Sequence, residues 1–395
     1  MKNFTNVTKF KFIYFLVFFG DSIFGNFLAL YLVNLQFSSY EKGTILAIVP
    51  IACFLGNLFF SYFGNDYKRN IILLKILSCT QFLSIFFFGY ISNIYVIAAL
   101  TFIFSFNNSS YFQIQDGTLS QSLRKYKKIY ATVRVFGSIG YLVGLLFSSF
   151  VFDFINYKIL FMISGIFFML TFVFLFSLDL KDYILDNFDS SNKGLHKITS
   201  SSPKMLLKNK YFYFYLACYV LLWGGTTLNW NIYPLYLNSL GLKDNEFAMF
   251  QGLTVIFETI FMYLNILIYK KVKSYKAFLF IAAILKITAI IFEVTIPSRY
   301  PLAILCMVVN GVGSGFFVFS NVNFINEVFG EKDLTRVLQY VVGINNLFLG
   351  VGNILAPIIY TNISYQVFFL LVGFLEILGT VCLIFVKKEK TLAIE

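Results

Sequence analysis

Charge and histidine are scarce in this sequence. Asp, Glu, Lys and Arg make up 13% of the 395 residues, whereas soluble domains carry about 25%. The single histidine, His196, lies in a polar stretch, which excludes grouped histidines for a proton relay, a catalytic set or a metal cluster. The chain is therefore not built to face water on all sides.

Cysteine is also sparse, and its spacing excludes the usual metal motifs. Each of the five cysteines falls within an apolar run, as small buried hydrophobic residues do. They are Cys53, Cys79, Cys218, Cys306 and Cys382. We therefore expect no metal and no cofactor. The first apolar run is about twice as long as a signal-peptide core, so we expect no cleaved signal.

Long apolar runs dominate instead, with 58% hydrophobic residues and 52 phenylalanines. A membrane helix needs about 20 apolar residues. Lipid admits only helices or closed barrels, and a barrel would show alternation rather than solid apolar runs. The sequence therefore predicts an all-α membrane protein with twelve spans: 10–34, 41–63, 70–90, 94–121, 129–152, 156–178, 209–238, 245–269, 275–294, 299–325, 333–359 and 363–386.

Lysine and arginine are concentrated on alternate loops, for example at Lys68 and Arg69 or at Lys270 and Lys271. By the positive-inside rule, both termini are cytoplasmic. A net charge of +12 could suggest a nucleic-acid partner, but this distribution of the positive charges indicates a multi-pass protein of the cell (plasma or inner) membrane instead. The long polar stretch 179–208 predicts a cytoplasmic linker between two six-helix bundles, 1–178 and 209–395. We expect a monomer in the lipid bilayer.

The two halves are related in sequence. "NFLALYLVNLQFSSYE" from Asn26 matches "NIYPLYLNSLGLKDNE" from Asn231 at an offset of 205 residues. "RVFGSIGYLVG" from Arg134 matches "YVVGINNLFLG" from Tyr340 at an offset of 206. Two parallel six-helix repeats are the plan of the major facilitator fold, which binds its substrate near the middle of the membrane.

Ionisable residues within the predicted spans are functional candidates, because burying a charge in lipid is costly. Asp116 and Arg134 lie nine residues on either side of Lys125 in a turn between two spans, so they are expected at similar depth. Arg134, Ser138 and Tyr141 share one helix face. This set offers donors, a hydroxyl and a ring to a polar or planar ligand. A structural salt bridge between two helices is the alternative.

Asp21 and Glu258 have no obvious partner on their own helices. A carboxylic acid in a low-dielectric site can change its protonation near physiological pH, so both are candidates for proton coupling. A hydrogen-bonded structural acid is the alternative for each. Lys286 and Glu376 are interpreted as peripheral or structural, and Glu327 and Arg336 as an interfacial pair.

Other polar and small residues on the central spans have simpler roles. Amides are expected to line the central helices, with Asn345 and Asn346 as candidate substrate contacts. Gly137, Gly140 and Gly144 are interpreted as positions of close helix contact.

At these residues the sequence resembles the lactose-permease-like oligosaccharide, nucleoside and phenylpropionate proton symporters of the major facilitator superfamily. "YATVRVFGSIGYLVG" is similar to the fifth-helix signature of that group. In the lactose permease, an acid eighteen residues before the arginine helps to bind sugar, a position that Asp116 occupies here. The resemblance assigns ring stacking to Tyr141. "FETIFMYLNILIYKKVKSYK" is similar to the eighth helix of the nucleoside symporters and assigns a binding or coupling role to Glu258.

Some features depart from the resemblance. The loop "YFGNDYKRN" keeps Asp66, Lys68 and Arg69 without the usual glycine spacing. The lactose permease's tenth-helix histidine and glutamate have no clear counterpart, so its proton route cannot be transferred. Asp21 is not typical of the lactose-permease group, although other sugar symporters carry a first-helix aspartate. The proline of the antiporter motif is missing from "GSIGYLVGLL", which favours uptake over efflux.

The sequence thus predicts a non-enzymatic secondary transporter that takes up a sugar or nucleoside with protons by alternating access. The candidate substrate residues are Asp116, Arg134, Ser138, Tyr141, Glu258, Asn345 and Asn346, with Asp21 and Glu258 for the proton. Uptake of an aromatic acid, sodium-coupled symport and proton-driven efflux remain open. An intramembrane lipid-linked transferase is the alternative from another class.

Overall fold

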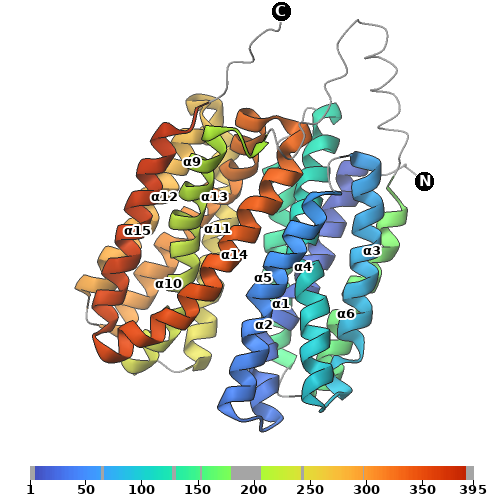
Figure 1. The fold of residues 1–395 in the computed structure, drawn as a ribbon, viewed down its shortest axis with the longest axis vertical. Coiled ribbons are helices and arrows are strands. Elements are labelled where there is room, and N and C mark those ends of the chain that lie inside the picture. The colour runs from blue at the N-terminus through green and yellow to red at the C-terminus, as the bar shows by residue number, and fades with distance from the viewer. Residues whose placement is uncertain are drawn as a thin grey trace, which may run out of the picture. The chain divides into compact units, whose positions relative to one another are not determined.

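The computed structural model describes residues 5–63, 66–126, 130–151, 154–178, 206–241, 244–296 and 298–387. These residues form helices joined by short turns, and no strand occurs among them. The first half contains α1 (Asn6–Asn34), α2 (Ser39–Ser61), α3 (Tyr67–Phe86), the 3₁₀ turn η1 (Phe88–Tyr90), α4 (Ile94–Tyr126), α5 (Ala131–Val151) and α6 (Tyr157–Phe176). Figure 1 labels these helices.

The second half repeats this order. It contains α9 (Lys210–Cys218), the π-helical segment η2 (Tyr219–Gly224), α10 (Gly225–Ser239), α11 (Asp244–Val272), α12 (Tyr275–Thr295), α13 (Arg299–Phe329), α14 (Glu331–Asn362) and α15 (Tyr365–Phe385). The segments α9, η2 and α10 follow one another without a break and form the seventh span. Figure 1 shows them in the C-terminal half.

Polar side chains cap several helix starts. Ser38 and Glu41 form a reciprocal capping box at the start of α2. Asp66, Asn156 and Ser274 accept a backbone N–H at the starts of α3, α6 and α12. Each cap satisfies an N–H that has no partner within the helix. The apolar runs therefore begin as helices at positions marked in the sequence.

Ten of these helices are long and apolar enough to cross a membrane, by length and composition. The other two predicted spans correspond to α4, which carries several amides and Asp116, and to the seventh span, which the π-helical segment interrupts. The prediction of an all-α membrane fold with twelve helices in two related halves is thus confirmed. Most of the predicted linker, residues 179–205, lies outside the described residues.

The structure divides into two compact units. The N-terminal unit comprises Met1–Ser200 and Glu331–Gly343, and the C-terminal unit comprises Ser201–Gly330 and Ile344–Glu395. In the first, α1 packs against α5 and α6, and α4 packs against α2 and α3. In the second, α13 packs against α11 and α12, and α15 packs against α12 and the seventh span.

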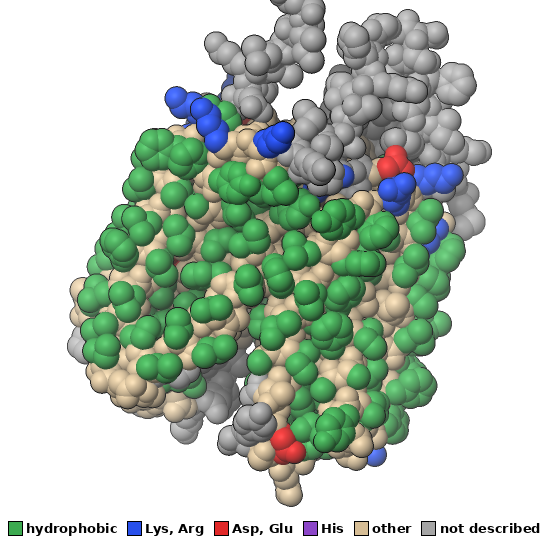
Figure 2. All heavy atoms as spheres, in the orientation of Figure 1, with side chains coloured by type: hydrophobic (Ala, Val, Ile, Leu, Met, Phe, Trp, Pro, Cys, Tyr) green, Lys and Arg blue, Asp and Glu red, His purple; other side chains and the backbone are tan. Residues whose placement is uncertain are grey.

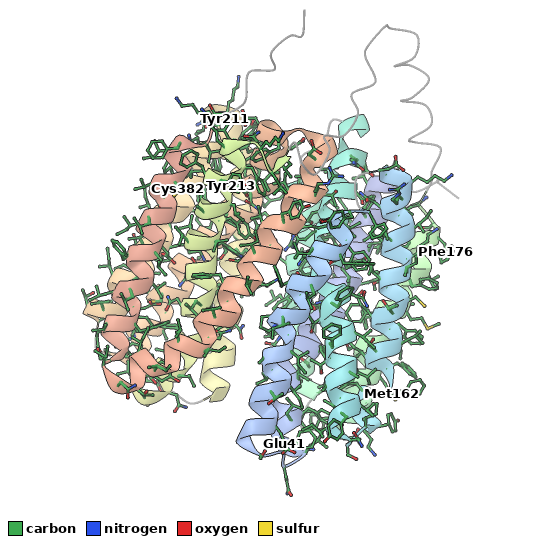
Figure 3. All side chains as sticks on the ribbon, viewed as in Figure 1. Glu41, Met162, Phe176, Tyr211, Tyr213 and Cys382 are labelled. Atoms are coloured by element: carbon green, nitrogen blue, oxygen red, sulfur yellow. The ribbon has the colours of Figure 1, made fainter. Side chains whose placement is uncertain are left out.

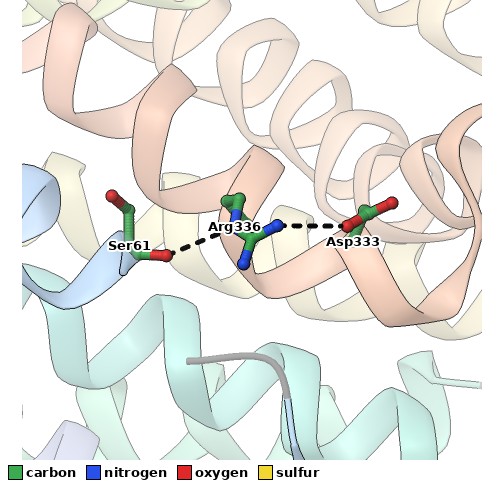
Figure 4. Close-up of polar contacts among 3 residues, drawn as sticks. All are labelled: Ser61, Asp333 and Arg336. Atoms are coloured by element: carbon green, nitrogen blue, oxygen red, sulfur yellow. Dashed lines mark hydrogen bonds and ion pairs between the residues drawn. The ribbon is translucent and has the colours of Figure 1, made fainter. Parts of the chain in front are cut away.

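The start of α14 belongs to the N-terminal unit, whereas the sequence places it in the C-terminal bundle. Arg336 Nε donates to the backbone oxygen of Ser61 at 3.3 Å, and its Nη1 lies 3.5 Å from Asp333 Oδ1. Figure 4 shows these contacts. The interfacial pair drawn from the sequence joined Arg336 to Glu327. The ion pair seen here uses Asp333, three residues earlier on the same helix.

The internal repeat is visible in the packing of aromatic rings. In the first repeat, Tyr31 packs against Tyr157 and Phe161, with ring centroids 5.3 and 5.2 Å away. In the second, Tyr236 packs against Tyr365 and Phe369 at 5.2 and 5.0 Å. The same corner between the first and sixth helices of each repeat is therefore built from the same residue types.

The surface of each unit suits a bilayer. Hydrophobic side chains cover the sides of each unit, and Lys and Arg side chains gather at one end of each (Figure 2). Phe176, with 60% of its surface exposed, projects outward from α6, while Glu41 extends from the end of its unit (Figure 3). An apolar side face with charge restricted to the ends is the pattern of a membrane-spanning bundle.

Candidate functional site

The contact between α1 and α5 is made by the glycines of α5. A Cβ on Gly140 would lie 2.3 Å from the backbone oxygen of Phe15, and one on Gly144 would lie 2.2 Å from Ser22 Oγ. Neither position has room for a side chain, so the two backbones approach closely. This contact places the polar residues of α5 beside α1.

Asp116 of α4 is held by phenolic hydroxyls. Tyr14 of α1, which is fully buried, donates to Asp116 Oδ1 at 2.5 Å. The hydroxyl of Tyr130, just before α5, also bonds to this carboxyl group. Tyrosines from two segments thus hold the half-buried carboxylate of a third, α4.

Arg134 lies in the same cluster. Its guanidinium carbon is 4.3 Å from the ring centroid of Phe18 and 6.0 Å from that of Tyr14. A Cβ on Gly137 would lie 2.7 Å from Arg134 Nη1, so this glycine leaves room for the guanidinium. Asp116 is within electrostatic reach of Arg134. Asp116 and Arg134 therefore lie in one cluster, in which Tyr14 bonds to Asp116 and its ring lies 6.0 Å from the guanidinium of Arg134.

Ser138 and Tyr141 continue along α5 from Arg134. Ser138 is buried, and Tyr141 is half-buried with its hydroxyl 3.3 Å from Asn26 Nδ2. Seven residues of helix place Tyr141 about 10 Å beyond Arg134. The predicted set is therefore an elongated row facing α1 rather than a single point of contact.

Asp21 has a partner that its own helix does not reveal. Asn108 Nδ2 of α4 donates to Asp21 Oδ1 at 2.7 Å, and Gln81 Nε2 of α3 donates to Asn108 Oδ1 at 2.7 Å. Three helices are thus linked by a chain of side-chain hydrogen bonds that ends at a carboxylate. These hydrogen bonds orient Asp21 through neutral amides, and no positively charged side chain takes part in them.

The remaining predicted residues belong to the C-terminal unit. Glu258 of α11 is half-buried, and its backbone lies against Gly315 of α13. Asn345 is buried, with its Oδ1 2.4 Å from where a Cβ of Gly224 would lie. Asn346 is half-buried beside it on α14. Glu258 thus lies beside α13, and Asn345 lies beside the seventh span, within the same unit.

The structure adds a buried cluster that the sequence interpretation undervalued. Lys286 and Glu293 of α12 and Glu376 of α15 are 4%, 1% and 1% exposed. Lys286 and Glu376 are therefore not peripheral, and Glu293 was not recognised at all. Its spacing of seven residues from Lys286, which places both on one helix face, is the signal that could have found it.

Comparison with known proteins agrees with this fold. The profile of the MFS_1 like family matches residues 7–371. The crystal structure of the nucleoside transporter NupG is similar with a TM-score of 0.64, 16% identity, and coverage of 96% of this chain and 98% of that chain. A mutant of NupG is similar with a TM-score of 0.66, 16% identity, and coverage of 96% and 99%. No curated protein sequence matches the chain.

The family match covers most of the chain, and the solved structures share the same twelve-helix fold. The intramembrane charges and the internal repeat fit a carrier of small solutes. The chain therefore belongs to the MFS_1 like family of the major facilitator superfamily, as a multi-pass membrane transporter.

Proposed function

We propose that the protein takes up a nucleoside or a sugar together with protons by alternating access. The observation that carries this proposal is the cluster of Asp116, Arg134, Tyr14 and Phe18 in the N-terminal unit. An arginine provides a fork of donors, a carboxylate accepts hydroxyl protons, and aromatic rings offer stacking faces. A hydroxyl-rich ring uses all three kinds of contact.

Each unit offers its own candidate solute contacts. In the N-terminal unit they are Asp116, Arg134, Ser138 and Tyr141, which form a row about 10 Å long on α5 together with α4. In the C-terminal unit they are Glu258, Asn345 and Asn346. Asp21, at the end of the hydrogen-bond chain through Asn108 and Gln81, and Glu258 are candidates for proton coupling. Glu258 serves either role.

The gathering of Lys and Arg at one end of each unit supports cytoplasmic termini by the positive-inside rule. The likeness to NupG in fold makes nucleosides the first solutes to test, although an identity of 16% carries the fold alone. We place the protein in the cell membrane as a monomer.

The test is uptake by the purified chain in proteoliposomes with an imposed pH gradient. Radiolabelled uridine and adenosine, lactose and a phenylpropionate are offered in turn. We expect at least one to accumulate, and the accumulation to disappear when a protonophore collapses the gradient. Movement of none of them, or uptake that follows sodium and ignores protons, would contradict the proposal.

Two alternatives are read from the same experiment. Accumulation of the phenylpropionate alone indicates an aromatic-acid carrier, in which Arg134 binds the carboxylate. Export of preloaded solute that is driven by protons entering the liposome indicates efflux. A lipid-linked transferase would instead convert the labelled solute into a lipid-soluble product, which extraction of the liposomes detects.

A further inference from the structure

A second group of buried ionisable residues lies in the C-terminal unit, outside the candidate solute contacts. Lys286 and Glu293 of α12 and Glu376 of α15 are each at least nine-tenths buried. The helices α12 and α15 pack against one another, and α15 also packs against the seventh span. Three ionisable side chains are thus enclosed where these helices meet.

The ammonium group of Lys286 is satisfied by neutral oxygen atoms. It donates to Ser314 Oγ at 2.8 Å, to the backbone oxygen of Asn310 at 3.0 Å and to Asn310 Oδ1 at 3.3 Å. It also lies 5.5 Å from the ring centroid of Trp223. These neutral acceptors use its three hydrogens and do not neutralise its charge. The positive charge of Lys286 is therefore balanced by carboxylates within electrostatic reach.

The two buried carboxyl groups lie within that reach. Glu376 and Glu293 both interact electrostatically with Lys286, as does the half-buried Glu258 of α11. Glu293 accepts Asn229 Nδ2 on both oxygens at 2.9 Å. If both buried acids were ionised, one lysine would leave an excess negative charge in an apolar interior, which is costly. Binding a single proton removes that excess.

Other titratable groups near the cluster do not supply this proton. Tyr233 and Tyr236 of α10 and Cys306 of α13 lie within electrostatic reach of Glu293. Phenols and thiols keep their protons over the physiological range. The proton that balances the cluster is therefore carried by a carboxyl group.

The contacts of Glu376 identify it as that group. Thr226 Oγ of α10 lies 2.8 Å from Glu376 Oε1 and 3.0 Å from the backbone oxygen of Leu222. A hydroxyl has one hydrogen, so it donates to only one of these acceptors at a time. When Glu376 is ionised, Thr226 donates to it. When Glu376 is protonated, the acid donates to Thr226, and Thr226 donates to Leu222.

The second oxygen of Glu376 supports the protonated form. Glu376 Oε2 is buried and has no hydrogen-bond partner. An unpaired oxygen costs less on a neutral acid than on a carboxylate. The space is also closely fitted, because a Cβ on Gly225 would lie 3.2 Å from Glu376 Cγ.

The switch in Thr226 reaches an irregular part of the seventh span. Leu222 belongs to the π-helical segment Tyr219–Gly224, and its backbone oxygen also accepts the N–H of Gly225. Single π-helical turns occur frequently at functional sites. Within the same segment, Trp223 stacks on Phe317 of α13 with centroids 4.1 Å apart. Protonation of one acid thus changes the hydrogen bonding at this segment.

We propose that Lys286, Glu376 and Glu293 form a proton-binding site of the C-terminal unit, and that Thr226 transmits the protonation of Glu376 to the π-helical segment. The transport consequence rests on the proposed proton-coupled uptake. The binding of the proton itself does not, which allows the two to be tested separately.

The first experiment detects the proton without any solute. The full chain in lipid nanodiscs is titrated with acid and base, and infrared difference spectra record the carbonyl band of protonated carboxyl groups. We expect Glu376→Gln to remove one titrating band and Glu293→Gln to shift it. A Glu376→Gln spectrum that titrates like the wild type would overturn the proposal, whatever the transport assays show.

The second experiment tests the role of Thr226 against a matched control. Thr226→Val and Thr227→Val each remove a hydroxyl that bonds the backbone oxygen four residues earlier, since Thr227 Oγ lies 2.9 Å from the oxygen of Trp223. Only Thr226 also contacts a carboxyl group. Both variants are reconstituted and tested with uridine or with whichever solute the wild type accumulates.

We expect Thr226→Val to lower proton-driven accumulation about tenfold, the value of one hydrogen bond to a charged group. Exchange of labelled for unlabelled solute without a pH gradient should remain near the wild-type rate, which also shows that the variant is folded. Thr227→Val should behave like the wild type in both assays. Equal effects of the two variants would reject the role of Thr226. A wild type that ignores the proton gradient would instead reject the proposed function.

Discussion

The two repeats share a scaffold and differ in where they carry charge. The ring corner at Tyr31 in the first repeat and at Tyr236 in the second is the same. Yet Asp21 and Asp116 are replaced, 205 residues later, by Thr226 and Asn321. Arg134 is replaced by Tyr340, 206 residues later. The two repeats therefore share this packing but carry their ionisable groups at different positions.

One contact shows this difference in detail. In the first repeat, the hydroxyl of Tyr14 donates to the carboxylate of Asp116. In the second, the hydroxyl of Tyr215 donates to the amide oxygen of Asn321. A tyrosine of the first helix thus bonds to the fourth helix in each repeat, although Tyr215 lies one turn before Tyr219, the position equivalent to Tyr14. The group that it holds is charged in one repeat and neutral in the other.

For Glu376, the buried acid of α15, the charged group is in the second repeat and the neutral group is in the first. The helices α6 and α15 align at an offset of 208, which pairs their capping residues Asn156 and Ser364 and also Gly165 and Gly373. At this offset Glu376 corresponds to Phe168, which is fully buried and packs against the ring of Phe104. The buried acid that we propose as a proton site therefore belongs to the second repeat alone, whereas the pair of Asp116 and Arg134 belongs to the first.

The largest effect is expected from Arg134→Lys. Lysine keeps the charge and loses the planar fork and its stacking on Phe18, which should lower solute uptake roughly 100-fold, as for two charge-assisted hydrogen bonds. Initial uptake rates in proteoliposomes measure this. Lys11→Arg, which retains a cation over the ring of Phe136, is the control from the same helix pair. Unchanged uptake by Arg134→Lys would remove this residue from the solute site.

Exchanging the residues at the Tyr14 and Tyr215 contacts tests the comparison directly. Asn321→Asp places a carboxylate at a buried position of the second repeat, where no arginine stands at the site equivalent to Arg134. We expect a loss of stability of roughly 2–3 kcal/mol, the cost of an unpaired acid in a membrane helix. Thermal unfolding in detergent measures it.

The reciprocal change, Asp116→Asn, leaves the tyrosine hydrogen bond and removes the charge. It should reduce uptake about tenfold with a smaller effect on stability. If Asn321→Asp and Asp116→Asn lowered stability equally and left uptake unaltered, the difference in charge between the two repeats would have no role in transport.

Glycine substitutions test whether close helix packing stabilises the scaffold that the two repeats share. Gly140→Ala would push a methyl group into the backbone of Phe15, so we expect a loss of about 1–3 kcal/mol from overpacking. Gly25→Ala, where a Cβ meets nothing within 4 Å, should be neutral or slightly stabilising. Unfolding midpoints in detergent measure both. A stable Gly140→Ala variant would contradict the close approach of α1 and α5.

The smallest effect concerns the exposed start of α2. Hydrogen bonds from Ser38 lower the pKa of Glu41. Because the pKa of Glu41 is lower in the folded state than in the unfolded state, its cap stabilises the folded protein fully when the pH is above the unfolded-state pKa. This stabilisation is lost as the pH falls through the folded-state pKa. The protection factors of amides in the first turn of α2, which correct for the intrinsic pH dependence of exchange, should therefore fall on acidification, and Glu41→Gln should abolish that change. Glu246→Gln at the equivalent position of the second repeat is the control.

Much of the site was predictable, and the misses have physical reasons. Asp116 and Arg134 could be paired because a short turn fixes the relative depth of two antiparallel helices. Asn108 as the partner of Asp21, and Tyr14 as that of Asp116, could not be predicted, because they depend on how α1 rotates against α4. Glu293 was overlooked because a residue close to a helix end is assigned to the membrane interface by sequence alone.

Hydropathy, the charge of the loops and the internal repeat by themselves determined a twelve-helix membrane transporter, because lipid admits only helices or closed barrels and solid apolar runs exclude a barrel. Only the tertiary structure decided which polar groups meet. Tyr14 donates to Asp116, Lys286 donates to neutral oxygen atoms, and Thr226 stands between Glu376 and a π-helical segment. Such contacts depend on helix rotation and on glycines that allow close approach, and hydrophobic periodicity specifies neither to within one hydrogen bond.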